Sequence, residues 1–223
     1  MGTIEATFGF VDLAGFTALT EAHGDEEAVS LLDRFETIAV TALGPRDRFV
    51  KTIGDAVMIA FADADAAIAG TTRLFDACMT AAEMPMPRAG LHHGGAVRRG
   101  GDYFGGTVNL AARVAAQAHG GQVLATDTVA DVARRRGVRV VDLGCFSLRN
   151  LARPVELFEL PLCPVAAGSA VDPVCRMQVP RASAAGRLRH DDTDYWLCSL
   201  RCAGAFAADP DNYVADIRPV GQS

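Results

Sequence analysis

Apolar positions recur with two different spacings along residues 1–160, and the two spacings predict different elements. Residues 25–43 carry apolar side chains every three or four positions, which is typical of an amphipathic helix. The same reasoning predicts helices over 63–83, 107–119 and 126–135. Short runs of β-branched, aromatic and other apolar residues predict strands at 6–12, 48–61, 88–93, 122–125, 138–143 and 145–160. Because helices and strands alternate irregularly and several strands form hairpins, we expect an α+β fold, with helices packed on one mixed or antiparallel sheet.

The most informative stretch is the hairpin at residues 48–61, which turns at Gly54 and Asp55. Lys51 and Asp55 are the only charged residues between Arg48 and Asp63. Burying an unpaired charge in an apolar hairpin lowers stability by several kcal/mol. Each of these two charges is therefore expected to be paired, exposed or bound to a ligand. The alternative is that Lys51 reaches solvent from an edge strand and Asp55 only shapes the turn.

Two further polar positions fall where elements begin. Asp12 ends the strand at 6–12, and the small-residue turn after it would leave backbone N–H groups free to bind phosphate beside a metal ion. Asn109 and Arg113 lie four residues apart and share one helix face, where they can clamp an anion. Two simpler interpretations remain: Asp12 only caps a helix, and Asn109 and Arg113 are only exposed to solvent.

Composition excludes some functions. The chain has 223 residues, 50% of them hydrophobic, and a formal net charge of −6. This acidic balance argues against general binding to nucleic acid or to an anionic membrane. No apolar run reaches the roughly twenty residues that span a bilayer, so we expect a cytoplasmic protein. Residues 94–106 hold six glycines and predict a loop or a loose hairpin. His92 and His93 point to opposite faces of a strand, which favours structural roles.

Five separated segments together resemble the catalytic domain of class III nucleotidyl cyclases. They are VDLAGFT at 11–17, VKTIGDAVMIAF at 50–61, RAGLHHG at 88–94, DYFGGTVNLAAR at 102–113 and LRNLARPVELFEL at 148–160. They occur in the order and with the spacing of that family. The resemblance runs from about Phe8 to Leu160 and implies a catalytic domain over residues 1–160. It implies the ferredoxin-like α/β sandwich of the family. GGDYF at 100–104 resembles the signature of diguanylate cyclases, but the other four segments have no place in that family.

The resemblance implies a role for each matched residue. Asp12 and Asp55 correspond to the two metal-binding aspartates, with the Leu13 backbone carbonyl as a further ligand, and the cofactors would be two Mg²⁺ or Mn²⁺ ions per active site. Lys51 and Asp102 correspond to the pair that reads adenine. The remaining matches are Asn109 for the ribose, Arg113 for the transition state, and Phe16, Thr17, Arg88 and Arg149 for the phosphates; backbone N–H groups from Ala14 to Thr17 are expected near the triphosphate.

These matches imply that the chain makes 3′,5′-cyclic AMP from ATP. In the family, each active site forms between two catalytic domains, one supplying the metal ligands and the other the base-reading and transition-state residues. Since this chain holds both groups, the expected partner is a second copy, in a head-to-tail homodimer. Two alternatives are a guanylate cyclase and a catalytically silent module of the same family.

The last quarter of the chain has a different character. Residues 161–170 are linker-like in composition. Residues 171–216 resemble a YHS domain, through VDPVCRM at 171–177 and DYWLCSLRCAGAFAADPDNY at 194–213, although Arg176 replaces the usual glycine. Cys175, Cys198 and Cys202 could converge on Zn²⁺ or Cu⁺, with His190 or a nearby Asp as a fourth ligand. A metal-free miniature core built on Trp196, Phe206 and Tyr213 is the alternative.

Overall fold

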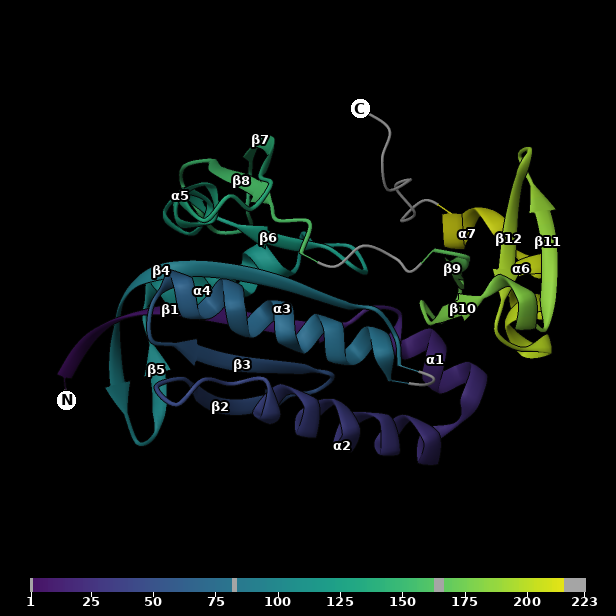
Figure 1. The fold of residues 1–223 in the computed structure, drawn as a ribbon, viewed down its shortest axis with the longest axis horizontal. Coiled ribbons are helices and arrows are strands. Elements are labelled where there is room, and N and C mark those ends of the chain that lie inside the picture. The colour runs from purple at the N-terminus through teal and green to yellow at the C-terminus, as the bar shows by residue number, and fades with distance from the viewer. Residues whose placement is uncertain (1, 82–83, 163–166, 215–223) are drawn as a thin grey trace.

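One eight-stranded mixed sheet forms the frame of the molecule. The computed structural model describes residues 2–81, 84–162 and 167–214. The strand order is β2-β3-β1-β4-β6-β8-β7, with β5 paired to β4 (Figure 1). The strands are β1 (Gly2–Leu13), β2 (Arg48–Ile53), β3 (Ala56–Phe61), β4 (Pro87–Arg99), β5 (Asp102–Phe104), β6 (Val123–Ala125), β7 (Val141–Phe146) and β8 (Val155–Glu159). Neighbours are antiparallel except β4 and β6, which are parallel. The α+β class and the mixed sheet are therefore confirmed.

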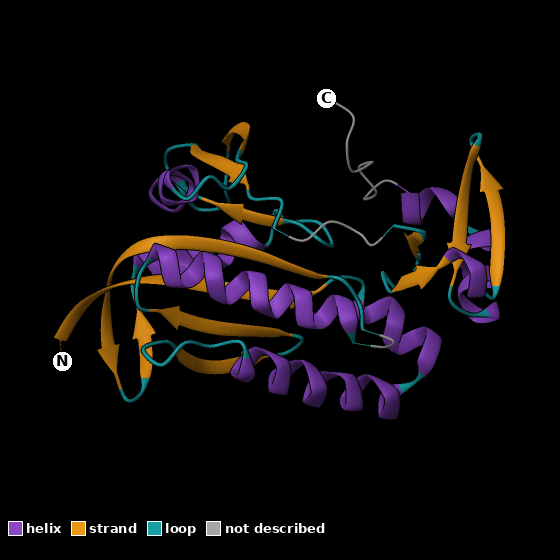
Figure 2. Cartoon of the chain, viewed as in Figure 1, coloured by secondary structure: helices purple, strands orange, loops and turns teal. Residues whose placement is uncertain are grey.

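Five helices accompany this sheet (Figure 2). They are α1 (Phe16–His23), α2 (Asp25–Thr41), α3 (Ala64–Thr80), α4 (Gly106–Ala115) and α5 (Asp127–Arg135). The predicted helices at 25–43, 63–83 and 126–135 match within three residues at either end, whereas the one at 107–119 ends four residues early. No helix among the described residues combines the length and hydropathy that a membrane span requires.

Alternating side chains of β1 build two cores, one on each face of the sheet. Val11 and Leu13 pack into a core with residues of α2 and α3, such as Phe35 and Phe75. Phe8 and Phe10 point to the opposite face, and their core includes residues of β5 and α4. Successive side chains of a strand point to opposite faces, so Asp12 shares the face of Phe8 and Phe10. The end of β1 thus presents a carboxylate on the face that α4 covers.

The glycine-rich segment follows one of the two predicted alternatives. Residues 94–106 were expected to form a loop or a loose hairpin, and the hairpin is confirmed, because β4 continues to Arg99 and pairs antiparallel with β5. Gly94 and Gly95 lie within this strand, where small size allows close packing: a Cβ at Gly94 would lie 3.1 Å from Thr107 Oγ1. Only Gly100 and Gly101, with φ of 60° and 86°, make the turn.

The end of the sheet differs from the prediction. The two strands predicted over 138–143 and from 145 onward are a single bulged strand, β7, whose register on β8 shifts between Asp142 and Cys145. Gly144 has a φ of 78°, a left-handed conformation that accommodates the bulge.

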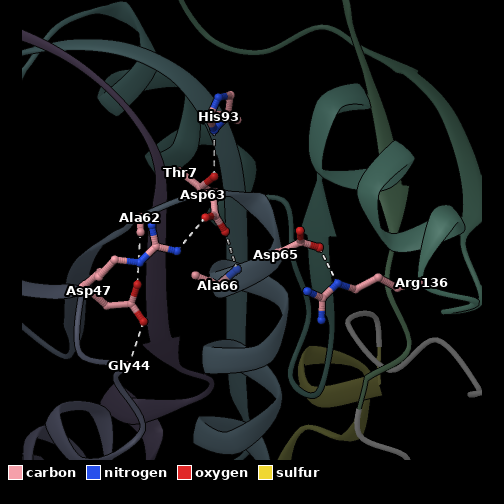
Figure 3. Close-up of polar contacts among 10 residues, drawn as sticks. Thr7, Gly44, Asp47, Ala62, Asp63, Asp65, Ala66, His93 and Arg136 are labelled. Atoms are coloured by element: carbon pink, nitrogen blue, oxygen red, sulfur yellow. Dashed lines mark hydrogen bonds and ion pairs between the residues drawn. The ribbon is translucent and has the colours of Figure 1, made fainter.

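Polar contacts fix the ends of several elements (Figure 3). Asp63 is the N-cap of α3, because its side chain accepts a hydrogen bond from Ala66 N at 2.8 Å. Asp65 instead pairs with Arg136 after α5. His93 bonds Thr7 at 2.9 Å, while His92 bonds Thr126 at 2.7 Å. The adjacent histidines therefore have different partners, as their structural interpretation predicts.

The cysteine-rich tail forms a small unit beside α1 (Figure 1). It consists of β9 (Ser169–Val171), β10 (Gln178–Pro180), β11 (Gly186–His190), β12 (Thr193–Leu197), α6 (Leu200–Ala208) and α7 (Pro210–Val214), with a 3₁₀ turn at Arg181–Ser183. β9 pairs with β10, and β11 pairs with β12. The expected linker at 161–170 overlaps the start of β9, residues 163–166 lie outside the described part, and so do residues 215–216 at the end of the expected domain.

The aromatic core of the tail differs from the one suggested by sequence. Phe206 is buried and contacts Tyr195 and Tyr213, with ring centroids 4.9 and 6.4 Å apart. Trp196 lies instead beneath the guanidinium groups of Arg181 and Arg187. Neighbouring strand residues face opposite ways, so Tyr195 takes the inner position that Trp196 was expected to fill.

Candidate active site and a thiol cluster

Asp12 and Asp55 are brought together by strand pairing. Asp12 on β1 is the register partner of Ala56, the residue after Asp55 and the first residue of β3. On its other side Asp12 pairs with Arg88 of β4. The Arg88 side chain donates to Asp12 Oδ2 from Nε at 2.8 Å and from Nη2 at 2.5 Å. The two predicted metal-binding carboxylates therefore share one end of the sheet with an arginine that orients one of them.

The carboxylate oxygens of Asp12 and Asp55 at this end of the sheet are suited to binding a divalent cation. Asp12 Oδ1 is buried and has no hydrogen-bond partner, although its other oxygen is bound to Arg88. Burial, followed by the nearby charge of Asp12, raises the pKa of Asp55. Two carboxylates with an unpartnered buried oxygen have an unfavourable electrostatic arrangement that bound Mg²⁺ or Mn²⁺ would relieve, since both ions prefer oxygen ligands.

A cavity of about 310 Å³ lies next to these residues. The catalytic part contributes Leu13 through Ala18, together with Asp55, Arg88, His119 and Gly120. Gly15, with a φ of 73°, makes the turn into α1, and the first N–H groups of a helix have no partner within it. The Ala14 N–H donates to the Met86 carbonyl at 3.1 Å and is therefore already hydrogen-bonded. Phe16 and Thr17, at the start of α1, keep the position suited to a phosphate.

Lys51 and Asp102 meet although 51 residues separate them in sequence. Lys51 Nζ donates to Asp102 Oδ2 at 2.5 Å, and each side chain keeps part of its surface in solvent. The hydrogen bond from Lys51 holds the pKa of Asp102 below its usual value. Asp102 also accepts from the Tyr103 backbone N–H, and Tyr103 packs edge-on to Phe8 at 5.3 Å. A fixed donor and acceptor thus stand side by side on the face of the sheet that carries Asp12.

The other predicted residues lie on α4 and on the loop before β8. Asn109 is exposed and Arg113 is half-buried, and both lie on α4, which packs on the same sheet face through Val108 and Ala111. Arg149 is exposed in the loop between β7 and β8. Asn109, Arg113 and Arg149 are therefore not part of the cavity beside Asp55.

The tail closes one side of that cavity, a feature the sequence did not reveal. Its lining includes Val174, Arg176, Asn212 and Tyr213. Arg176 has a left-handed φ of 61°, where a glycine was expected, and its Nη2 donates to the Tyr213 carbonyl at 3.1 Å. A Cβ added at Gly15 would lie 2.8 Å from Arg176 Cγ. The tail therefore packs directly against the turn that begins α1.

The three tail cysteines converge, as the sequence suggested, but with an unforeseen neighbour. Cys175 Sγ lies 3.4 Å from Cys198 Sγ, which lies 3.7 Å from Cys202 Sγ and 3.9 Å from His23 Nε2. Hydrogen bonds from the two other thiols hold the pKa of Cys202 well below its usual value. His190, the fourth ligand suggested by sequence, instead bonds Asp211 at 2.9 Å. His23 lies about 150 residues earlier in the chain, and no local pattern marks it as a partner of the cysteines.

Comparison with known proteins identifies relatives of the larger part of the chain. The family described as the adenylate and guanylate cyclase catalytic domain matches residues 3–160. A pH-sensitive adenylate cyclase, MT1302 of Mycobacterium tuberculosis, is 36% identical over 163 residues, which are 71% of this chain and 41% of that protein. An adenylate cyclase of Streptomyces griseus is 40% identical over 129 residues, 57% of this chain and 32% of that protein. The chain thus matches less than half the length of these relatives.

Solved structures show the same fold. An adenylate cyclase of Trypanosoma brucei, in its monomeric state, superposes with a TM-score of 0.65 at 25% identity, covering 72% of this chain and 89% of that one. The guanylate cyclase domain of RhGC from Catenaria anguillulae, in complex with GTP, gives a TM-score of 0.60 at 18% identity, covering 72% of this chain and 98% of that one. Both comparisons cover nearly the whole of the solved domain.

Proposed function

This chain belongs to the adenylate and guanylate cyclase catalytic-domain family, and from that premise we propose that it converts ATP to 3′,5′-cyclic AMP and pyrophosphate. The observation that carries the proposal is the strand pairing that brings Asp12 beside Ala56, and so close to Asp55, at one end of the sheet, with one buried Asp12 oxygen left unpartnered. An arrangement that merely stabilised the fold would satisfy that oxygen.

The reaction needs charge stabilisation more than proton transfer. The ribose 3′-oxygen attacks the α-phosphorus, the bond from that phosphorus to the bridging oxygen breaks, pyrophosphate leaves, and the hydroxyl proton passes to solvent. Bound Mg²⁺ or Mn²⁺ would lower the pKa of the hydroxyl and stabilise the phosphate charge. Asp12, Asp55 and the Leu13 carbonyl are the groups that would hold the ions. Arg88 keeps the Asp12 carboxylate oriented, and the N–H groups of Phe16 and Thr17 bind phosphate oxygens.

Base selection follows from the Lys51–Asp102 pair. Adenine offers ring-nitrogen acceptors and an exocyclic amine donor, which suit an ammonium and a carboxylate respectively. Guanine presents a carbonyl oxygen where adenine has the amine, so Asp102 would face an acceptor. The salt bridge holds both groups in place before the nucleotide arrives, which lowers the cost of ordering them. We therefore favour ATP over GTP.

The complete site requires a second copy of the chain. Asn109 and Arg113 lie on α4, away from the cavity that Asp55 lines. In a head-to-tail homodimer, the metal-binding group of one subunit faces the base-reading and α4 groups of its partner, and two equivalent sites form. Asn109 then orients the ribose, and Arg113 stabilises charge that develops in the transition state. Arg149 serves as an additional phosphate contact.

The tail is assigned a regulatory role. We propose that residues 171–216 form a YHS-like domain whose three cysteines bind Zn²⁺ or Cu⁺, and that its contact with the cavity adjusts access to the site. The support for this proposal is the position of Val174 and Arg176 in the lining of the cavity.

A product analysis tests the enzymatic proposal. The purified full chain is incubated with ATP or GTP and Mn²⁺, and the nucleotides are separated by chromatography. Cyclic AMP should form from ATP, little cyclic GMP should form from GTP, and Asp55→Asn should abolish both. Absence of any cyclic nucleotide from the folded wild-type dimer would indicate the catalytically silent member of the family.

A further inference from the structure

The thiol cluster includes a histidine from the catalytic part of the chain. One ligand atom from each of His23, Cys175, Cys198 and Cys202 lies within 4.8 Å of all the others. His23 is the last residue of α1, whereas the cysteines lie in the loop after β9, directly after β12 and in the first turn of α6. The cluster therefore joins two parts of the molecule that are far apart in sequence.

The spacing of the four atoms is that of a tetrahedral metal site. Zinc–sulfur bonds of about 2.3 Å and zinc–nitrogen bonds of about 2.0–2.1 Å place tetrahedral ligands about 3.8 Å apart for two sulfurs and about 3.6 Å apart for sulfur and nitrogen. The measured separations are 3.4 and 3.7 Å between sulfurs and 3.9 Å between Cys198 Sγ and His23 Nε2. The other three separations are no more than 4.8 Å, so one central ion would have to draw some of these ligand atoms inward by up to about 1 Å.

A buried carboxylate holds the ligands in position. Asp172 has no exposed surface, and its Oδ1 accepts from the backbone N–H of Val174 at 2.8 Å and of Cys175 at 3.3 Å. Its Oδ2 accepts from Cys198 N at 2.7 Å. One side chain thus fixes two cysteine backbones from segments 23 residues apart in sequence. Such outer-shell support is typical of protein metal centres.

The thiol cluster is more buried than the second group of potential metal ligands in the tail, His190, Asp191 and Asp211. Cys175 and Cys202 have no exposed surface, while Cys198 and His23 are half-buried. The other group of potential ligands, His190, Asp191 and Asp211, includes two exposed carboxylates. Three thiolates and one imidazole suit a soft or borderline ion, and four protein ligands leave no open position for a substrate.

We propose that His23, Cys175, Cys198 and Cys202 form a closed structural Zn²⁺ centre that fastens the tail to the catalytic domain through α1. The same helix begins at the cavity, where Gly15 meets Arg176, and ends at the metal. Met86 N also donates to the Arg176 carbonyl at 3.0 Å, and Arg201 donates to the Glu21 carbonyl at 3.1 Å. The ion therefore holds Val174 and Arg176 in their places along the cavity wall.

Metal binding by the full chain tests this proposal, and no readout needs turnover, so its failure is distinct from failure of the cyclase proposal. The reduced, metal-free protein is titrated with Co²⁺ in excess Mg²⁺, and Zn²⁺ affinity is then measured by displacement. We expect one Co²⁺ per chain, with the visible spectrum of a tetrahedral ion and thiolate charge-transfer absorption. His23→Ala should weaken Zn²⁺ binding by more than about 100-fold, beyond the 10–100-fold typical of lost outer-shell partners.

Two variants complete the test. His23→Cys should retain a tetrahedral spectrum, because a fourth thiolate also suits the ion. His190→Ala should bind Zn²⁺ as the wild type does, since His190 belongs to the other group. Near-wild-type Zn²⁺ affinity and an unchanged Co²⁺ spectrum in folded His23→Ala would overturn the proposal. So would a wild-type protein that takes up no Zn²⁺, or one in which Cys175 and Cys198 remain a disulfide under reducing conditions.

Discussion

At Asp55, burial and the charge of Asp12 both disfavour ionisation, so its pKa is raised in the folded state. A carboxyl with a raised folded pKa binds protons more tightly in the native than in the unfolded chain. Its contribution to stability therefore falls as pH rises from the ordinary Asp pKa of 3.8 through the raised pKa of the folded state. Above that range the ionised carboxylate lowers the free energy of unfolding of the metal-free protein.

This reasoning predicts opposite effects of Asp55→Asn on stability and activity. In EDTA at neutral pH the variant should unfold at a higher temperature than the wild type, because it removes a disfavoured charge. Its cyclase activity should fall by at least about 100-fold, because a metal ligand is lost. Thermal unfolding with and without Mn²⁺, together with activity, measures both effects.

Asp33→Asn, on the exposed side of α2, is the matched control and should change neither quantity appreciably. Mn²⁺ should raise the unfolding temperature of the wild type and of this control, but not that of Asp55→Asn. Equal stabilisation of all three proteins by Mn²⁺ would contradict the assignment of Asp55 as a ligand.

The Lys51–Asp102 pair predicts a change of substrate. A carboxylate at position 51 would accept from the N–H groups of guanine, and a small side chain at position 102 would no longer repel the guanine carbonyl oxygen. Lys51→Glu combined with Asp102→Cys should shift the ratio of kcat/KM for GTP over ATP by at least about 100-fold, because mismatched polar groups reject a base strongly. Steady-state assays with both nucleotides measure the ratio.

Arg48→Glu reverses an exposed charge on the same strand and should leave the ratio near the wild-type value. If the double variant remains active and still prefers ATP by the wild-type factor, Lys51 and Asp102 do not read the base.

Among individual residues, the sequence predicted those that share a local motif and missed those joined only by folding. The resemblance to the family predicted that Lys51 and Asp102 act together, and Lys51 Nζ lies 2.5 Å from Asp102 Oδ2. The role of Arg88 was assigned to phosphate, whereas here it holds Asp12. His23 could not be found, because no sequence pattern links the end of α1 to cysteines about 150 residues later.

At the scale of elements, the position of α4 depends on the absence of a side chain at Gly90 of β4. A Cβ at this position would lie 2.0 Å from Ala115 N and 2.5 Å from Ala115 Cα. Both are backbone atoms that cannot move without shifting the helix. The helix that carries Asn109 and Arg113 can therefore approach the sheet only over a glycine.

Gly90→Ala should lower the free energy of unfolding by about 1–3 kcal/mol, the usual cost of overpacking, and should reduce kcat by displacing α4. Denaturant unfolding and cyclase kinetics test this prediction. Gly204→Ala, in the middle of α6 with no atom near its added Cβ, is the control and should be neutral or stabilising by up to about 1 kcal/mol. An unshifted unfolding midpoint for Gly90→Ala would show that α4 does not pack this tightly.

Helix boundaries were predictable because capping and periodicity are local, and Asp63 marks the start of α3 in sequence and structure alike. Glycines were less informative. Gly94 and Gly95 were interpreted as part of a loop or a loose hairpin, and they lie in β4 of a hairpin, where Thr107 Oγ1 donates to the Gly95 carbonyl at 2.7 Å. A glycine needed for close packing and one needed for a turn look identical in sequence, and only the tertiary neighbours distinguish them.

For the whole molecule, the tail is part of the same core as the catalytic domain. Cys175, Cys202 and Phe206 are buried in one hydrophobic cluster with residues of α2 and α3. A short bridge between Pro85 and Met177 adds a backbone connection. A change at the thiol cluster, such as loss of the proposed metal, would therefore be expected to shift the tail residues that line the cavity beside Asp55.

The account depends most on a site shared by two copies of the chain, and complementation between inactive subunits tests it directly. Asp55→Ala and Arg113→Ala are co-expressed with different tags, and heterodimers are isolated by tandem purification. One of their two sites carries both substitutions and the other carries neither, so the heterodimer should have about half the activity of the wild-type dimer.

Pairing Asp55→Ala with Asp12→Ala provides the control, because metal ligands are then lost from both sites and no activity should return. Recovery of about half the wild-type cyclic AMP formation in the first heterodimer, and none in the second, is the predicted result. A folded Asp55→Ala/Arg113→Ala heterodimer without activity would contradict the shared site.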